Sequence, residues 1–151
     1  MYYSFNDVIK ERLLRSGWYP NRSINIDKYL YVLEEQGYYV HNNAMNFFHN
    51  LGEIKIEHEA YADPTDIDVS DFTPTKPADC LDPLWVEHYE SIIGNKLCPI
   101  GLGFSEHMTF FLSESGSFYG GYDDYFCLIG NDVESALQNL FFDHDFTQLE
   151  K

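Results

Sequence analysis

Cysteines, basic residues and long apolar runs are all scarce in this chain of 151 residues. Cys80, Cys98 and Cys127 are an odd number at wide spacing with no Cys-x-x-Cys pair, which argues against a disulfide framework and against a zinc site. No apolar run approaches the length of a membrane span, and the N-terminus lacks the basic and then apolar pattern of a secretory signal. We therefore expect a cytoplasmic protein in which Cys98 and Cys127 are reduced and buried in strands, with Cys80 more exposed in a loop.

Basic residues are few, because nine Lys and Arg stand against 25 Asp and Glu, giving a formal net charge of −16. The imbalance is uneven: residues 1–36 hold five bases and five acids, whereas residues 37–151 hold four bases and twenty acids. A field of this sign repels nucleic acid and anionic membranes, and it attracts basic proteins or cations. Two interpretations stay open at this point. The acids keep the protein soluble, or they steer a basic partner towards it.

Apolar residues make up 44% of the chain and include twelve Tyr, twelve Phe and two Trp, which is typical of a packed globule. The length fits one domain over residues 1–151. Apolar residues at helical spacing predict helices before Gly17, over 28–36, over 43–51, over 83–93 and from Asn131 onward. Alternating and short apolar segments predict strands over 53–59, 67–72, 96–100, 107–112, 117–119 and 125–129. Helices at both ends that flank strands joined by hairpins predict an α+β fold.

Local sequence also predicts how the helices begin. We expect Ser4 or Asn6 to cap the first helix, Asp27 to cap the second, and Asn42 to precede the third. The last helix has capping-box spacing from Asn131 to Glu134. The inward face of the first helix is predicted to consist of Phe5, Val8, Ile9 and Leu13. The segments 61–82 and 119–125 are expected to be mostly loop.

A rigid aromatic corner follows the first predicted helix. Gly17 can adopt the left-handed conformation that ends a helix, and Pro20 prevents the helix from resuming. Trp18 is too large to leave in water, so we expect it to be substantially buried. Arg22 then has a rigid setting from which to bind carbonyl groups or a carboxylate. The corner is therefore predicted to be structural rather than catalytic.

Six histidines and many carboxylates prompt a search for a catalytic or metal site. Residues 57–59 and 143–145 are the densest clusters, but neighbours on a strand point to opposite faces, so His58 cannot converge with Glu57 and Glu59 on one ion. His107 has no accompanying Gly-x-Ser-x-Gly elbow, and the glycines lack the spacing of a phosphate-binding loop. We expect no enzyme, no metal and no cofactor, and a hydrolase remains the less favoured alternative.

Several short segments, taken in order, resemble the SUKH superfamily of bacterial immunity proteins, and in particular the group marked by a Gly-Trp-x-Pro-x-Arg start. The family often has Gly where Asn21 stands, and Asn is the next most tolerant residue in a left-handed turn. The resemblance implies an α+β fold with a mixed, mainly antiparallel sheet, in which Pro99 and Gly101 belong to the structural motif. The matching segments are 17–22, 37–38, 47–52, 93–101, 111–119, 128–130 and 136–137.

The resemblance also implies that the protein neutralises a bacterial toxin by binding its toxic domain, and many such toxins are nucleases. The charge supplies a mechanism, because an acidic surface can occupy a basic active site in place of nucleic acid. An acidic module for another basic partner, or a mimic of nucleic-acid charge, is the alternative. The candidate contact residues form two groups: Glu57, Glu59, Asp63, Asp66, Asp68 and Asp71, and then Tyr122, Asp123, Asp124 and Tyr125.

Overall fold

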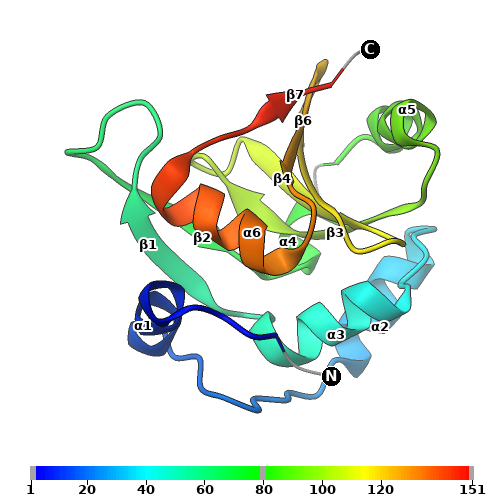
Figure 1. Ribbon diagram of the computed structural model, residues 1–151. Coiled ribbons are helices and arrows are strands. Elements are labelled where there is room, and N and C mark those ends of the chain that lie inside the picture. Colours follow the sequence, from blue (N-terminus) through cyan, green and yellow to red (C-terminus); the bar gives the residue numbers. More distant parts are fainter. Residues whose placement is uncertain (1–2, 79–80, 150–151) are drawn as a thin grey trace.

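A computed structural model describes residues 3–78 and 81–149 of the chain. Helices occupy the N-terminal third, strands the middle, and a further helix and a short strand the C-terminal end (Figure 1). The elements are α1 (Asp7–Arg15), α2 (Asp27–Glu35), α3 (Asn42–Leu51), β1 (Lys55–Glu59), β2 (Ile67–Asp71), α4 (Thr75–Ala78), α5 (Pro83–Ile93), β3 (Leu97–Gly103), β4 (Met108–Ser113), β5 (Phe118–Tyr122), β6 (Tyr125–Gly130), α6 (Val133–Gln138), the π-helix η1 (Asn139–Asp143) and β7 (Thr147–Gln148).

The strands form one sheet in which each strand is hydrogen-bonded to its neighbours in sequence, in the order β1 to β7. Every pairing among the described residues is antiparallel. The predicted α+β class is confirmed, and the sheet in this part of the chain is antiparallel throughout rather than mixed. The connections from β1 to β2 and between successive strands from β3 to β6 are short, which suits the hairpin turns that the sequence contains. The connection from β2 to β3 contains α4 and α5, and the connection from β6 to β7 contains α6 and η1.

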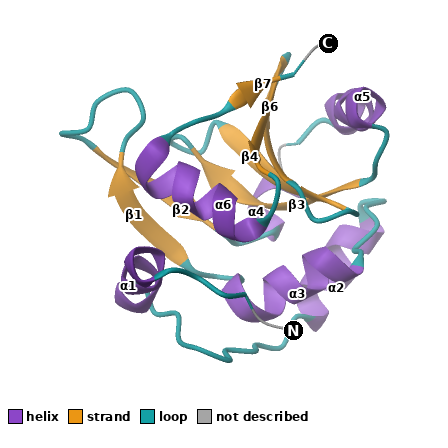
Figure 2. Cartoon of the chain, viewed as in Figure 1, coloured by secondary structure: helices purple, strands orange, loops and turns teal. Residues whose placement is uncertain are grey.

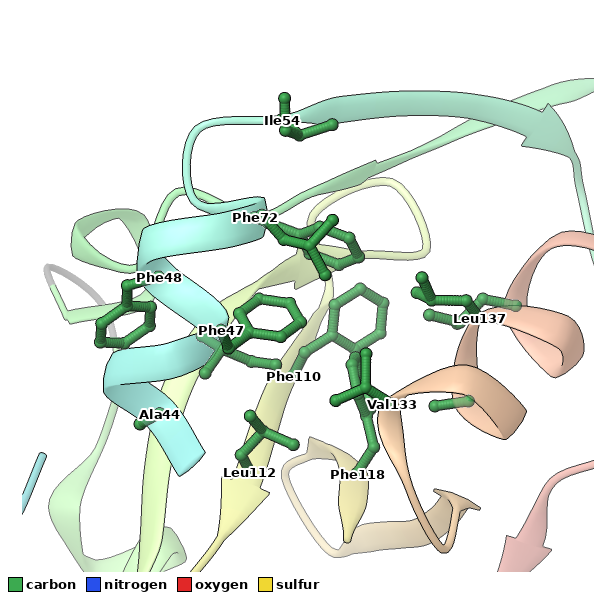
Figure 3. Close-up of a cluster of buried hydrophobic side chains, with 14 of the residues drawn as sticks. Ala44, Phe47, Phe48, Ile54, Phe72, Phe110, Leu112, Phe118, Val133 and Leu137 are labelled. Atoms are coloured by element: carbon green, nitrogen blue, oxygen red, sulfur yellow. The ribbon is translucent and has the colours of Figure 1, made fainter. Parts of the chain in front are cut away.

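Helices cover both faces of the sheet (Figure 2). The larger core lies under α3 and α6, where aromatic rings from α3, β4 and β5 pack together with the ring of Phe72, which follows β2 (Figure 3). Phe47 of α3 lies 5.0 Å from Phe72 between ring centroids, and Phe110 of β4 lies 5.4 Å from Phe118 of β5. The opposite face carries a smaller core under α5, in which Tyr89 stacks on Phe126 at 4.4 Å. The alternation of side chains along β3 to β6 therefore serves two cores at once.

Helix positions were predicted well, but several caps were not. Asn6 caps α1 as expected, whereas Ile26 occupies the N-cap of α2 without a side-chain bond and Asp27 is already helical. His41 caps α3, its Nδ1 accepting from the amide of Ala44. The final capping box is shifted by one residue because Asp132, not Asn131, accepts from the amide of its N3 residue, Ser135.

Four other sequence predictions need correction. Val8 is 56% exposed, so the buried face of α1 is narrower than its apolar spacing predicted. Segment 61–82 contains the short α4, which was not predicted, in addition to β2, which matches the strand expected over 67–72. Segment 119–125 is the β5–β6 hairpin rather than a loop. The last helix changes to π-helical at Asn139, which the sequence did not predict. Cys98 and Cys127 are buried and free as predicted, and Cys80 lies outside the described residues.

The corner after α1 is buried, as expected for Trp18, and Arg22 binds a carbonyl group there. Trp18 is 5% exposed and Arg22 is 7% exposed, and Arg22 donates to the backbone oxygen of Asn50 at 2.9 Å. Gly17 and Asn21 both have positive φ angles, of 100° and 65°. The left-handed residue that the family often fills with Gly is therefore filled here by Asn, which tolerates it.

Pro99 and Gly101 lie in β3 on either side of a register shift against β4. A Cβ atom on Gly101 would stand 2.2 Å from the backbone oxygen of Asp71. Only glycine therefore allows β2 to approach β3 at this point, where the register pairs Asp71 with Leu102. This contact joins the β1–β2 hairpin to the rest of the sheet.

Candidate functional site

The meander places three of its connections at the same end of the sheet, because every connection from an odd-numbered to the next even-numbered strand lies there. We call this the hairpin-tip end and define it as residues 60–68, 104–107 and 122–125. The side chain of Asp68 accepts from the amide of Ser105 at 3.1 Å, which links the first segment to the second. His107 stacks on Tyr122 with centroids 5.8 Å apart, which links the second to the third.

The hairpin-tip end contains acids and no Lys or Arg. Two of its members, Asp123 and Asp124, lie more than fifty residues from the first acidic group in sequence, yet the meander brings both groups to one edge of the molecule. Like charges gathered at one edge raise the local negative potential above what the net charge alone produces. The acids of this end are Asp63, Asp66, Asp68, Glu106, Asp123 and Asp124.

Three other residues of the predicted acidic group lie away from these tips. Asp71 is only 4% exposed, and its carboxylate binds Lys76 Nζ at 2.7 Å, so it is held inside the structure. Glu59 forms an ion pair of 3.0 Å with Arg12 of α1, and the Arg12 guanidinium lowers the pKa of Glu59. Glu57 is exposed on the outer face of β1.

The first hairpin loop is ordered by its own side chains. Asp63 accepts from the amide and the hydroxyl of Thr65, at 3.0 and 2.7 Å. These hydrogen bonds lower the pKa of Asp63, which favours its ionised form. Asp66 is exposed beside them. The loop therefore presents ionised carboxylates in a defined turn, which reduces the conformational entropy that a partner must remove.

Exposed apolar residues accompany this charge. Ile67 and Val69 of β2 are 64% and 38% exposed, and Tyr61 in the loop is 58% exposed. They face outward because Ser70 and His58, which lie on the alternate positions of β1 and β2, fill the inward face. The alternation of residue types in the sequence does not reveal that here the apolar side chains face outward and the polar ones inward. An exposed apolar group rimmed by charge is typical of a protein contact surface.

A groove of about 580 Å³ runs between α1 and the β1–β2 hairpin. Its lining includes Arg12 and Arg15 on one side, and Ile67 and Val69 on the other. The groove carries charges of both signs, unlike the hairpin-tip end. We regard it as the flank of the contact surface rather than its acidic centre.

The second hairpin is anchored at its tip. The hydroxyl of Tyr89 in α5 donates to the backbone oxygen of Asp123, which holds the β5–β6 turn against the helix. Tyr122 is 51% exposed, whereas Tyr125 is half-buried, and burial raises the pKa of Tyr125 to about 12. Of the two predicted aromatic contacts, Tyr122 is thus the more accessible.

The clusters considered for metal binding do not converge in the described part of the chain. His58 is 5% exposed and faces inward, with its Nε2 at 2.8 Å from the Ser70 hydroxyl, while Glu57 faces outward. Among the described residues, no group of three or more metal-ligating side chains is close enough to hold an ion. His144 follows η1 in a left-handed conformation, and its ring lies 5.8 Å from that of Tyr61.

A protein-family model described as SUKH-3 immunity protein matches residues 5–142. The chain belongs to the SUKH-3 immunity protein family. Membership confirms the resemblance to the SUKH superfamily and gives the chain an immunity role. Neither the curated proteins nor the solved structures provide a match. The three segments of the hairpin-tip end all lie inside the matched range of this SUKH-3 protein, and β7 lies outside it. Within its described residues, no helix is both long and apolar enough to cross a membrane.

Proposed function

We propose that this SUKH-3 immunity protein binds the toxic domain of a cognate bacterial toxin in the cytoplasm, and that this domain is a nuclease. The observation that carries the proposal is the hairpin-tip end, whose three segments bring six carboxylates to one edge and contain no Lys or Arg of their own. Lys76, from outside these segments, lies 3.7 Å from Glu106. A nuclease must attract phosphate groups, so its active site presents basic side chains. An acidic edge of this kind competes with nucleic acid for the same site and needs no chemistry of its own.

Charge and exposed aromatic groups have separate roles in this proposal. Asp63, Asp66, Asp123 and Asp124 supply long-range attraction, which raises the association rate. Tyr61 and Tyr122, each more than half exposed, supply contact area that excludes water once the partner has arrived. Glu57 and Glu59 extend the surface along β1, whereas the buried Asp71 supports it from inside.

The test uses the toxin domain encoded beside this protein, expressed with wild type and with two variants of equal net charge. The tip variant carries Asn in place of Asp63, Asp66, Asp123 and Asp124. The control variant carries Gln in place of four exposed acids elsewhere, namely Glu11, Glu34, Glu35 and Glu114. Association rates are measured by stopped flow between low and physiological salt, beside rescue of growth.

We expect the tip variant to associate roughly tenfold more slowly at low salt and to show a flatter salt dependence, while the control variant keeps most of the wild-type rate. Equal rates for the two variants would contradict steering by this edge. Failure of wild type to bind or protect would contradict the immunity assignment for that toxin. Binding to a toxin that does not cleave nucleic acid would contradict the nuclease assignment alone.

A further inference from the structure

A small pocket opens on the sheet face opposite the main core, beside α5. Its floor is a row of cross-strand neighbours, since Leu102 pairs with Thr109 and Thr109 pairs with Gly121. A Cβ atom on Gly121 would lie 2.5 Å from Cε2 of Tyr89. Glycine at this position therefore lets the Tyr89 ring lie directly against β5.

Aromatic rings form the walls of this pocket. Trp85 stacks on Tyr89 from α5, with centroids 6.2 Å apart and planes inclined by 20°. On the other side His107 stacks on Tyr122, 5.8 Å apart and inclined by 17°. The volume is about 270 Å³, just below the ~300 Å³ at which sites for drug-sized ligands begin. A pocket of this volume suits one amino-acid side chain rather than a drug-sized ligand.

Three acidic residues complete the lining, namely Asp82, Glu106 and Asp123, and none of the lining residues is Lys or Arg. Asp82 caps α5 by accepting from the amide of Leu84 at 2.9 Å, which fixes its position. Lys76 comes within 3.7 Å of Glu106, but its ammonium group lies closer to Asp71, at 2.7 Å. The pocket therefore combines π faces with net negative charge.

We propose that this pocket binds one arginine side chain of the toxin. A guanidinium group is planar, weakly hydrated and rich in donors, so it stacks on aromatic faces and binds carboxylates at its edge. A neutral side chain would gain the stacking but not the attraction between a guanidinium and the acidic residues. The source of the arginine rests on the proposed function, whereas the preference of the pocket for guanidinium does not.

The first experiment uses the whole protein and small probes. Nα-acetyl-arginine methylamide is titrated against Trp85 fluorescence and the amide signals of Gly121 and Tyr122 at low salt, with the neutral isostere Nα-acetyl-citrulline methylamide as comparison. Trp85→Phe identifies the fluorescent reporter, because the second tryptophan, Trp18, lies in the main core. We expect saturable changes with the arginine probe and none with the citrulline probe. Equal responses to both probes would overturn the proposal.

Matched charge variants locate the site. Asp82→Asn keeps a good N-cap and removes one charge from the pocket, and Glu106→Gln removes another. Asp63→Asn removes one charge from the first hairpin loop instead. We expect each pocket variant to weaken arginine binding about twofold to fivefold, with Asp63→Asn close to wild type. If Asp63→Asn weakened arginine binding as much as Asp82→Asn, the probe would be responding only to the overall negative charge of the protein. That result would overturn the proposal.

The toxin complex then separates this inference from the proposed function. The double variant Asp82→Asn, Glu106→Gln should dissociate faster while keeping most of its association rate, because an anchored side chain acts at close range. A variant with Asn in place of Asp63 and Asp66, which do not line the pocket, should associate more slowly instead and keep the wild-type dissociation rate. Unchanged dissociation of the double variant would overturn the arginine anchor and leave the steering by the tips intact.

Discussion

The indole nitrogen of Trp18 donates a hydrogen bond to Oδ1 of Asn50 at 3.0 Å, and both residues are buried. The same Asn50 exchanges two further bonds with Arg22: its amide donates to the Arg22 backbone oxygen at 3.0 Å, and its backbone oxygen accepts from the guanidinium. One asparagine on α3 thus binds both Trp18 and Arg22 of the corner after α1. This contact fixes the N-terminal helix to the main core.

Trp18→Ala is expected to lower the free energy of unfolding by about 3–5 kcal/mol, as for other large aromatic truncations in a core. The loss includes the edge contact with Phe5, whose ring centroid lies 5.6 Å away. Urea unfolding measures the change, and toxin binding should persist in the fraction that stays folded. A variant that unfolds like wild type but no longer binds its partner would show that Trp18 is a contact residue instead.

Asn50→Ala is expected to lower the free energy of unfolding by about 1–3 kcal/mol, because it leaves the Trp18 N–H and the Arg22 carbonyl buried without this partner. Asn43→Ala is the matched control on the same helix. Asn43 is exposed, and its amide donates to the Glu114 backbone oxygen at 2.9 Å. The Asn43→Ala substitution should lower the free energy of unfolding by about 0.5 kcal/mol or less. Equal losses in urea unfolding would mean that the buried bonds of Asn50 to the corner contribute no more than the exposed bond of Asn43.

Thiol labelling should separate the described cysteines from Cys80. Burial raises the pKa of Cys127 to about 11 and raises that of Cys98 further, so both thiols are inaccessible and protonated near neutral pH. In a Cys80→Ser variant, we expect both to react only at the rate of unfolding, with denaturant restoring full reaction. In wild type we predict that Cys80 reacts first. Rapid labelling of Cys127 in the native protein would contradict its place in β6.

Stability should fall as the pH drops below about 6.5. Burial lowers the pKa of His58 and of His41 below the usual 6.5. The unfolded chain therefore binds protons that the folded protein excludes, and the loss proceeds from pH 6.5 down to the folded pKa. A hydrogen bond to the Glu59 backbone and the charge of Asp68 both raise the pKa of His58 and so oppose the effect of burial. The charges of His144 and Arg12 lower this pKa further.

His58→Gln removes one of these groups, so its unfolding free energy should vary less between pH 7 and pH 5 than that of wild type. Chemical unfolding at several pH values measures both slopes. Identical slopes would show that His58 is protonated in the folded state at pH 5 without cost, contrary to its burial.

Local chemistry made much of the fold readable. Helix ends at Gly17 and Gly94 follow from the left-handed conformation that both adopt, with φ of 100° and 66°. The inward face of α3 was predicted residue by residue, because Ala44, Phe47, Phe48 and Leu51 share one helical face and all are fully buried. The N-cap prediction was wrong where a tertiary contact determines which residue begins the helix. His41, which caps α3, also contacts the backbone oxygen of Leu112 in β4.

The candidate site was predictable only in part. Both acidic groups were identified from charge, but their proximity was not, since it depends on the meander order of the strands. Asp71 was predicted as a contact residue although Lys76 and burial remove it from the surface. The pocket beside α5 was missed altogether. Trp85 and Tyr122 lie 37 residues apart in sequence, and both line the pocket only because α5 packs beside the aligned strands β3 to β5.

The sequence by itself determined the class of the fold, the helix ends, the burial of Trp18 and the excess of negative charge, because these depend on residue type and on spacing within one element. Only the tertiary structure decided which acids share an edge, which apolar residues of β2 face outward, and where the pocket beside α5 lies. Those properties depend on strand order and register, which arise when the whole core packs and which no local pattern records.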